Sequence, residues 1–370
     1  MIHKLFTHNF RNLEPLELSL GAGVTVVSGN NGHGKTNLLE AIHWVTQGWS
    51  FRTRSFESAV RFGADEAWLR MEGTTHGGRP HRQGMMWRSG ELSVKVGVQE
   101  SKSLSALHGN IYAILLGPED IEIVKDGPER RRRWIDLLLC QRYPEGLDLL
   151  QRYRRILAQR NRFLKDHRGQ SATQIVDLPT LEVLTEQLGV LGAAVMVRRE
   201  ALIHELQGEV SRYYAQLSDQ AESIEMEYQG SVHMDAEPEL AAKLVRKMNA
   251  MRTLEFAQGI TAAGPQKDEL LIRFSGNRAS LREAGSQGQC RTTALAMGLV
   301  AVDVALGLDS EPPILLLDDI FAELDSVRRS SLAALIRDKQ CQVLVATPRA
   351  EDLPFHADAR LFVAAGKVVQ

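Results

Sequence analysis

Glycine, lysine and hydroxyl residues recur at a characteristic spacing near the start of the sequence. The stretch Gly29-Asn30-Asn31-Gly32-His33-Gly34-Lys35-Thr36 matches the pattern G-x-x-x-x-G-K-[ST] in full. In such a loop the glycines let backbone N–H groups close around phosphate oxygens, the lysine reaches the β- and γ-phosphates, and the hydroxyl ligates Mg²⁺. Lys35 and Thr36 are therefore candidates for binding a nucleoside triphosphate and its metal ion.

Two adjacent carboxylates lie near the other end of the sequence. The apolar run 314–317 predicts a buried strand, and Asp318 and Asp319 follow it directly. At the end of such a strand Asp318 would face Mg²⁺, and Asp319 would lie one residue further, where a base could polarise the water that attacks the γ-phosphate. We therefore predict that Asp318 binds the metal and that Asp319 is catalytic together with Lys35.

The distance between these two groups along the chain indicates how the site is assembled. About 280 residues separate them, whereas a single-domain protein with this loop usually closes the gap in roughly 50–150 residues. The sequence therefore predicts a nucleotide-binding lobe built from both ends of the chain, with a large segment inserted between. This arrangement excludes kinases and small GTPases.

Strand and helix patterns surround the glycine loop. Residues 24–27 form a β-branched apolar run, typical of a buried central strand, which leads directly into Gly29. After the loop, Leu38, Ile42 and Val45 recur at helical spacing. The loop is thus predicted to lie between a strand and a helix. The apolar run within 342–347 predicts a further strand of the same core.

A second glycine-containing loop precedes the carboxylates. Gly285-Ser286-Gln287-Gly288-Gln289-Cys290-Arg291 opens an apolar helix predicted to run from about Thr292 to Leu308. The N-terminus of a helix is a site for anions, because its backbone N–H groups and dipole both favour negative charge. The stretch resembles the signature motif of ABC-type ATPases, in which a serine and glycine N–H groups bind the γ-phosphate held by the partner subunit.

Further stretches make the chain resemble the RecF family of bacterial recombination-repair ATPases, short relatives of SMC proteins within the ABC class. They extend the match over nearly the whole sequence. They are Phe10-Arg11-Asn12, Ser50-Phe51-Arg52-Thr53, Pro118-Glu119-Asp120, 127–133 and 264–270. The sequence departs from the pattern at Gln266, where the family often has a histidine. It departs again at Thr347, where ABC ATPases often have a histidine that senses the γ-phosphate.

The resemblance implies an α/β fold. The expected architecture is an ABC-type P-loop ATPase head built from both termini, with an antiparallel β subsheet and an inserted α-helical lobe. Residues 1–117 and 259–370 would form the ATPase lobe, and residues 118–258 the helical lobe or arm.

The resemblance also implies the cofactors ATP and Mg²⁺ and the residues that bind them. The arginine of the first turn tends to lie near the nucleotide in this family. Thr36 and Asp318 are the expected metal ligands, and Asp325 could alternatively cap the helix predicted to begin near Ser326. The candidate nucleotide-binding residues are Arg11, Gly29, Asn30, Asn31, Gly32, His33, Gly34, Lys35, Thr36, Asn37, Ser286, Gly288, Gln289, Asp325 and Thr347.

At the level of function, the resemblance implies recombinational DNA repair and replication restart. Family members are expected to hydrolyse ATP weakly with stimulation by DNA, to form an ATP-dependent homodimer, and to bind gapped or junction DNA. RecR and RecO, the mediator proteins that help to load recombinase, are the implied partners.

Composition is that of an ordinary globular protein. The 370 residues are 44% hydrophobic and 24% charged, and three cysteines lie far apart without metal-ligand spacing. No signal-peptide pattern opens the sequence, so we expect a cytoplasmic protein. Because the net charge is only −2, DNA contacts must come from local basic faces.

The middle of the sequence changes from strand to helix patterns. Strands are predicted at 67–71, 92–98 and 111–116, with a polar turn at 74–80. Helices are predicted at 128–140, 145–165, about forty residues around 181–217, and 237–256, with a possible strand at 224–228 between the last two. A long antiparallel helical arm fits this pattern better than an SMC-length coiled coil.

Basic residues crowd two of these helices. One group is Arg130 to Arg133, and the other is Arg152, Arg154, Arg155, Arg160, Arg162 and Lys165. They are interpreted either as solvated surface paired with nearby acids or as a face that contacts DNA phosphates.

Two alternative functions stay open at this point. An ABC ATPase that serves a transporter would need a glutamine loop facing a membrane partner, and the arginine-rich insert speaks against it. A clamp that binds ATP to dimerise but hydrolyses it negligibly differs only in turnover, so an ATPase assay with and without DNA distinguishes it.

Overall fold

Strand β3 (Val24–Ser28), which leads into the phosphate loop, lies in the middle of a six-stranded sheet. The other strands of this sheet are β8 (Ala113–Leu116), β11 (Ile314–Asp318), β12 (Val343–Thr347), β13 (Ala359–Ala364) and β14 (Lys367–Val369). Their order is β14-β13-β3-β12-β11-β8, and all neighbours pair in parallel except β13 and β14. The predicted assembly of one sheet from both ends of the sequence is confirmed.

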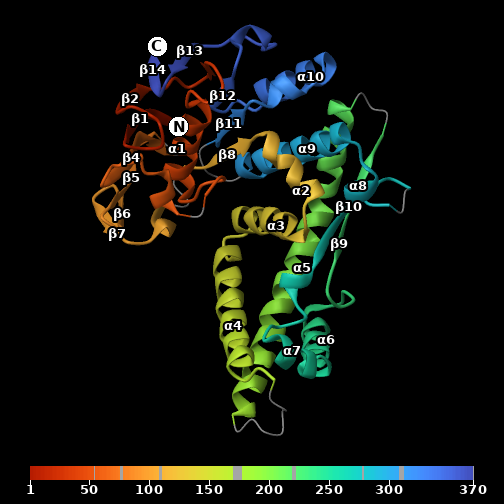
Figure 1. Cartoon of the computed structure of the whole chain (residues 1–370). Helices are drawn as coiled ribbons and strands as arrows, with labels where there is room; N and C mark the ends of the chain where they lie inside the picture. Colours follow the sequence, from red (N-terminus) through yellow and green to blue (C-terminus); the bar gives the residue numbers. More distant parts are fainter. Residues whose placement is uncertain are drawn as a thin grey trace. The chain divides into compact units, whose positions relative to one another are not determined.

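The structure is a computed structural model, and it describes residues 1–53, 55–75, 78–107, 111–169, 177–218, 222–276, 279–307 and 312–369. The chain forms two compact units. The first comprises Met1–Asp120, Gln216–Gln220 and Leu295–Gln370, and the second Ile121–Ala215 and Ala221–Ala294. Figure 1 colours the chain from red to blue, and both end colours occur in the first unit.

A second, antiparallel sheet completes the first unit. Its strands are β1 (Ile2–His8), β2 (Leu16–Ser19), β4 (Glu66–Thr75), β5 (Arg79–Arg88), β6 (Glu91–Val96) and β7 (Gln99–Ser101), in the order β2-β1-β4-β5-β6-β7. The sequence predicted a polar turn at 74–80, but Thr74 and Thr75 belong to β4 and Arg79 starts β5. Residues 76 and 77 lie outside the described residues. Strand β5 was not predicted from the sequence. Only Gln83 and Met85 are buried in it, so its residues do not show the apolar alternation that predicts a strand.

Helix α1 (Lys35–Gln47) packs on strands of both sheets, because it contacts β4 and β5 as well as β8, β11 and β12. Eleven of its thirteen residues are buried, so almost no face of the helix is left to solvent. Leu38, Ile42 and Val45 belong to the hydrophobic core of this unit, as their spacing predicted. Helix α10 (Ser326–Asp338) follows β11 and begins where the sequence placed it.

The second unit is mainly helical. Its helices are α2 (Glu122–Lys125), α3 (Pro128–Arg142), α4 (Gly146–Asp166), most of α5 (Leu178–Leu217), α6 (Glu237–Ala250), α7 (Arg252–Gln258), α8 (Leu281–Ala284) and the start of α9 (Gln287–Leu306). Strands β9 (Ile224–Gln229) and β10 (Glu269–Phe274) form an antiparallel pair. This pairing involves β10, which lies in the segment 259–294 that the sequence analysis placed in the ATPase lobe. The division into compact units places that segment with the helices.

The predicted helices are present with changed ends. The helix expected at 237–256 is two helices that meet at Met251. Helix α9 begins at Gln287 and not at Thr292, because side chains cap its N-terminus as described below. Leu308, its predicted end, lies outside the described residues. Helices α5 and α9 are long and apolar enough to span a membrane, but 50% and 67% of their apolar windows are buried in the protein.

Two arginines of the predicted basic clusters are buried, which neither interpretation of those clusters anticipated. Arg160 is fully buried, and its Nη2 atom donates to Oε2 of Glu255 at 2.7 Å while the rest of the guanidinium binds Thr185 and Thr261. Arg131 donates to both carboxylate oxygens of Glu269, at 2.8 and 2.9 Å. A guanidinium with most of its donors satisfied can be buried, so these two residues stabilise the unit and belong to no exposed basic face.

Candidate nucleotide-binding site

The phosphate loop connects β3 to α1 as predicted. Gly29 and Gly34 have φ angles of 145° and 115°, in the region that favours glycine. A Cβ atom on Gly29 would lie 2.2 Å from the carbonyl oxygen of Val363 in β13, so only glycine fits there. The loop is thereby shaped partly by a strand from the far end of the sequence.

Lys35 is the first residue of α1, and its ammonium group lies against the loop. Its Nζ atom donates to the carbonyl oxygens of Gly29 at 2.7 Å and Asn30 at 3.1 Å, and to Oδ1 of Asn31 at 3.4 Å. Burial lowers the pKa of Lys35, while the negative charges of Asp319 and Asp318 raise it. The ammonium therefore lies close to both the loop and the two carboxylates.

The two halves of the predicted site meet in the structure. Thr36 Oγ1 donates to Oδ1 of Asp318 at 3.0 Å across 282 residues of sequence. Burial raises the pKa of Asp318, and the hydrogen bond from Thr36 lowers it. The hydroxyl and carboxylate predicted to share a metal ion are thus direct neighbours.

Asp319 has a left-handed backbone conformation, which aspartate adopts more readily than most residues. Its φ angle is 51°, and its N–H donates to the carbonyl oxygen of Ala346 at 2.9 Å. Its Oδ1 atom is buried without a hydrogen-bond partner among the described residues. Burial raises the pKa of Asp319, and the charge of Lys35 lowers it. Unsatisfied buried oxygens of this kind occur where a water or ligand binds.

Thr347 and Asp325, two further candidate nucleotide-binding residues near the C-terminus, form hydrogen bonds with neighbouring backbone groups. Thr347 ends β12 beside Ser28 of β3, one residue before the phosphate loop, and its Oγ1 donates to the carbonyl oxygen of Arg349 at 3.2 Å. Asp325 caps α10, because its carboxylate accepts from the N–H of Arg328 at 2.9 Å. The capping role considered for Asp325 from the sequence is confirmed.

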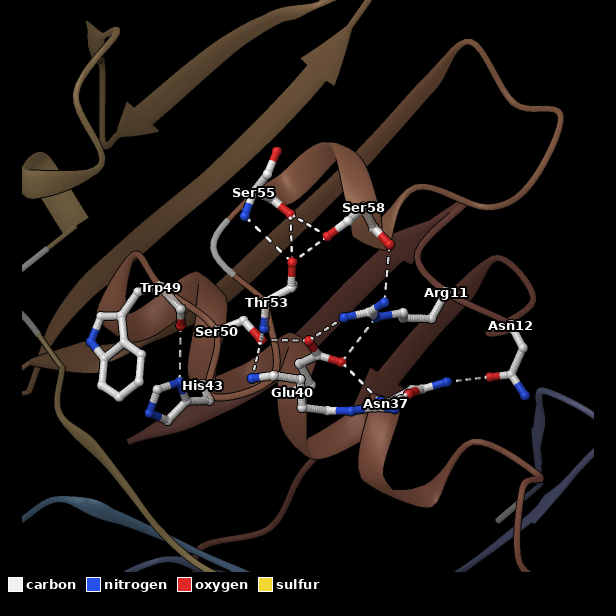
Figure 2. Close-up of polar contacts among 11 residues, drawn as sticks. Arg11, Asn12, Asn37, Glu40, His43, Trp49, Ser50, Thr53, Ser55 and Ser58 are labelled. Atoms are coloured by element: carbon white, nitrogen blue, oxygen red, sulfur yellow. Dashed lines mark hydrogen bonds and ion pairs between the residues drawn. The ribbon is translucent and has the colours of Figure 1, made fainter. Parts of the chain in front are cut away.

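Arg11 binds the carboxylate of Glu40, which was not among the predicted site residues. Figure 2 shows Arg11 and Ser50 both directed at Glu40, which lies on α1 and is fully buried. Arg52 joins the same carboxylate at 3.4 Å. A glutamate enclosed by apolar neighbours, in Leu38-Leu39-Glu40-Ala41-Ile42, is the signal that could have identified this residue.

A pocket of about 590 Å³ is lined in part by Asn12, whose Nδ2 donates to the carbonyl oxygen of Gly32 in the loop. Its lining includes Arg11, Arg52 and Arg61 with Glu14 as the acidic side chain among the lining residues. Asn37 also lines it and directly follows Thr36 in α1. The surplus of positive charge makes this pocket suited to an anionic ligand.

The signature residues Ser286, Gly288 and Gln289 belong to the second unit. The N–H of Gln289 donates to Ser286 Oγ at 3.2 Å, and the N–H of Ser286 donates to Oε1 of Gln289 at 2.8 Å. This reciprocal pair is a capping box, which starts α9 at Gln287. Gln289 Nε2 in turn donates to both carboxylate oxygens of Glu222.

Comparison with known proteins identifies the family. A family model described as an AAA domain matches residues 4–77, which include the phosphate loop. The DNA replication and repair protein RecF of Listeria monocytogenes serotype 4b (strain CLIP80459) is 35% identical over 342 residues, or 91% of this chain and 90% of that relative. The chain belongs to the RecF family. The resemblance predicted from the motifs is confirmed.

Solved structures agree with this membership of the RecF family. One described as the recombination mediator protein RecF-ATP in the RecFOR pathway has a TM-score of 0.87 at 28% identity, covering 100% of this chain and 96% of that one. An SMC head bound to the winged-helix domain of ScpA shares the fold, with a TM-score of 0.59 at 18% identity. The predicted α/β ATPase head with a helical insert is therefore confirmed.

Proposed function

We propose that this member of the RecF family is an ATP-dependent DNA-binding protein of recombinational repair and replication restart. The observation that carries the proposal is the contact of Thr36 Oγ1 with Asp318 Oδ1 at 3.0 Å, which joins the phosphate loop to the carboxylates. The solved RecF-ATP structure supports ATP as the ligand. The deciding experiment measures ATP turnover with and without gapped DNA, alongside gel filtration with and without ATP.

The side chains present fit a Mg²⁺ ion. Mg²⁺ prefers oxygen ligands and commonly uses one or two carboxylates together with substrate phosphates and waters. Thr36 and Asp318 would supply a hydroxyl and a carboxylate, and bound Mg²⁺ would neutralise charge on the phosphates. Lys35 and the backbone N–H groups of the loop would hold the β- and γ-phosphates, and Asp319 would accept a proton from the attacking water.

We further propose that ATP closes a homodimer, with each nucleotide held between Lys35 of one chain and Ser286 of the other. The capping box at Ser286 supports this, because it presents an ordered helix N-terminus with an exposed serine. Because the γ-phosphate would join the two chains, ADP should not support the dimer.

We therefore expect Ser286→Arg to abolish the ATP-dependent dimer while the monomer still binds ATP. Sedimentation in ATP and in ADP measures this, and Ser330→Arg on the exposed face of α10 is the matched control that should dimerise normally. Mixing Ser286→Arg with Lys35→Ala leaves one of two sites intact, so partial association should return. A dimer that persists equally in ADP would rule out this model.

DNA would contact the exposed cations of α4. Arg152, Arg155, Arg162 and Lys165 are exposed and fall within about 140° of the helix circumference at 100° per residue. Their acid contacts on the same helix are loose, since Arg152 lies 3.6 Å from Asp148 and Arg162 lies 3.8 Å from Asp166. Arg154, also predicted for this face, instead binds Asp136 at 3.1 Å.

Replacing Arg152, Arg155 and Arg162 by alanine should flatten the salt dependence of DNA binding. Removing one phosphate interaction lowers the log–log slope by roughly 0.9 on duplex DNA. Fluorescence anisotropy over a range of salt concentrations measures the slope. Alanine at the exposed residues Arg79, Arg337 and Arg360 of the first unit removes the same charge as a control. If the salt-dependence slope changes equally in both triple variants, the effect comes from net charge and not from a DNA-binding face on α4.

RecR and RecO remain the proposed partners, with weak DNA-stimulated turnover and a cytoplasmic location. The description of the solved relative as part of the RecFOR pathway supports the partners. A clamp without turnover is the competing proposal, and the assay of ATP turnover with and without DNA decides between the two.

A further inference from the structure

The buried carboxylate of Glu40 binds four donors from three residues. Arg11 donates through Nε to Oε2 at 3.1 Å and through Nη2 to Oε1 at 2.7 Å, and Ser50 Oγ donates to Oε1 at 2.5 Å. Arg52 Nη1 contacts Oε2 at 3.4 Å. Figure 2 shows Glu40 at the centre of these contacts. Both oxygens are therefore fully engaged by protein groups, and the surrounding cluster carries one net positive charge.

A series of hydrogen bonds leads from this cluster to the phosphate loop. Arg52 Nη1 also donates to Asn37 Oδ1 at 2.7 Å, and Asn37 Nδ2 donates to Asn12 Oδ1 at 2.7 Å. Asn12 Nδ2 then donates to the carbonyl oxygen of Gly32 at 3.2 Å. The position of Arg52 on Glu40 is thus linked through two amide side chains to the backbone of the loop.

Arg11 also occupies an unfavourable backbone conformation. Its φ angle is 51°, a region that non-glycine residues adopt at a cost. Its N–H donates to the carbonyl oxygen of Ala59 at 2.7 Å, and Nη1 donates to that of Ser58 at 3.0 Å. Together with Glu40, these contacts hold the guanidinium at the wall of the charged pocket.

We infer that Glu40 is a positioning residue for nucleotide binding, an inference that rests on the proposed ATP site. Glu40 touches no ligand itself, because its oxygens are occupied. It fixes Arg11 at the pocket and, through Arg52, Asn37 and Asn12, fixes the loop at Gly32. A purely structural ion pair would stabilise the fold equally but would leave ATP affinity unchanged.

Glu40→Gln tests the inference by titration calorimetry with ATP. We expect about tenfold weaker binding, the size of a mid-range coupling between contacting residues. Glu255→Gln is the matched control, because Glu255 is also a fully buried carboxylate paired with an arginine, in the second unit. Both variants should lower the urea midpoint, but Glu255→Gln should leave ATP affinity within about twofold. Equal ATP affinity in the parent and in Glu40→Gln would overturn the inference.

A mutant cycle between Glu40→Gln and the Arg11→Met/Arg52→Met pair separates positioning from general damage. Arg52 is 41% exposed, so Arg52→Met should fold normally. If Glu40 acts through Arg52 and Arg11, adding Glu40→Gln to the Arg11→Met/Arg52→Met background should cost less than about twofold in ATP affinity. Additive losses would overturn the inference.

If the Glu40→Gln variant does not fold, two other substitutions test the hydrogen-bond series that links Arg52 to Gly32. Asn12→Ala and Arg52→Met change its two exposed ends and are measured singly and together. The double variant should bind ATP no more weakly than the weaker single variant, and additive losses would again contradict a connected series. A parent protein that binds no ATP would refute the proposed function and with it this role, whereas a parent that binds ATP as tightly as Glu40→Gln does would refute the role of Glu40 alone.

Discussion

Lys35→Ala should weaken ATP binding by about 30- to 1,000-fold, corresponding to about 2–4 kcal/mol, without unfolding the protein. The reason is geometric, because the Lys35 ammonium lies on the loop carbonyls and beside both carboxylates. Without it, phosphate binding would lose its principal positive charge while the negative charges of Asp318 and Asp319 remain. Titration calorimetry measures the affinity, and urea unfolding checks the fold.

Lys4→Ala is the matched control for this experiment. Lys4 belongs to the same unit and forms an exposed ion pair with Glu17, so its removal deletes one positive charge away from the loop. Its ATP affinity should equal that of the parent. An unchanged affinity in Lys35→Ala would refute the assignment of the phosphate loop.

Asp319→Asn should lower the rate of ATP hydrolysis by about 10²- to 10⁴-fold, the usual contribution of a general base. ATP binding and dimerisation should persist, because water activation matters only in the chemical step. Asparagine tolerates the positive φ angle of this position, so the variant should keep the loop conformation. Single-turnover hydrolysis with bound ATP measures the step directly.

Asp318→Asn should have the opposite effect and impair Mg²⁺-dependent nucleotide binding. Comparing ATP affinity with and without Mg²⁺ in both variants distinguishes the two carboxylates. Glu323→Gln, which removes a nearby acid from the turn after Asp319, should hydrolyse ATP at nearly the parental rate. Equal loss of binding at Asp318 and Asp319 would make Asp319 a second metal-side group.

Short-range patterns made much of the nucleotide-binding lobe predictable. A β-branched run, a glycine loop and a helical apolar period are local signals, and they located β3 and α1 correctly. The apolar run before Asp318 located β11 in the same way. The glycine loop and the carboxylates are halves of one kind of site, so the sequence also predicted that the two segments meet, which the contact between Thr36 and Asp318 bears out.

Contacts with distant partners were not predictable. The apolar neighbours of Glu40 indicate a buried position, but its partner Arg11 lies 29 residues away and no local pattern identifies it. Arg160 reads as part of a basic surface, yet its partner Glu255 lies 95 residues away. In both cases the residue type favours solvent, and only the partner's charge makes burial favourable.

The place of β3 between β12 and β13 has a consequence for synthesis on the ribosome. About 315 residues separate Ser28 from Val343, so at 5–20 residues per second roughly 15–65 s pass before either neighbour of β3 emerges. Through that interval an apolar strand has two unpaired edges, which is a hazard for aggregation. A nascent chain arrested before residue 343 would lack β12 and β13, the two strands that flank β3 in the folded unit.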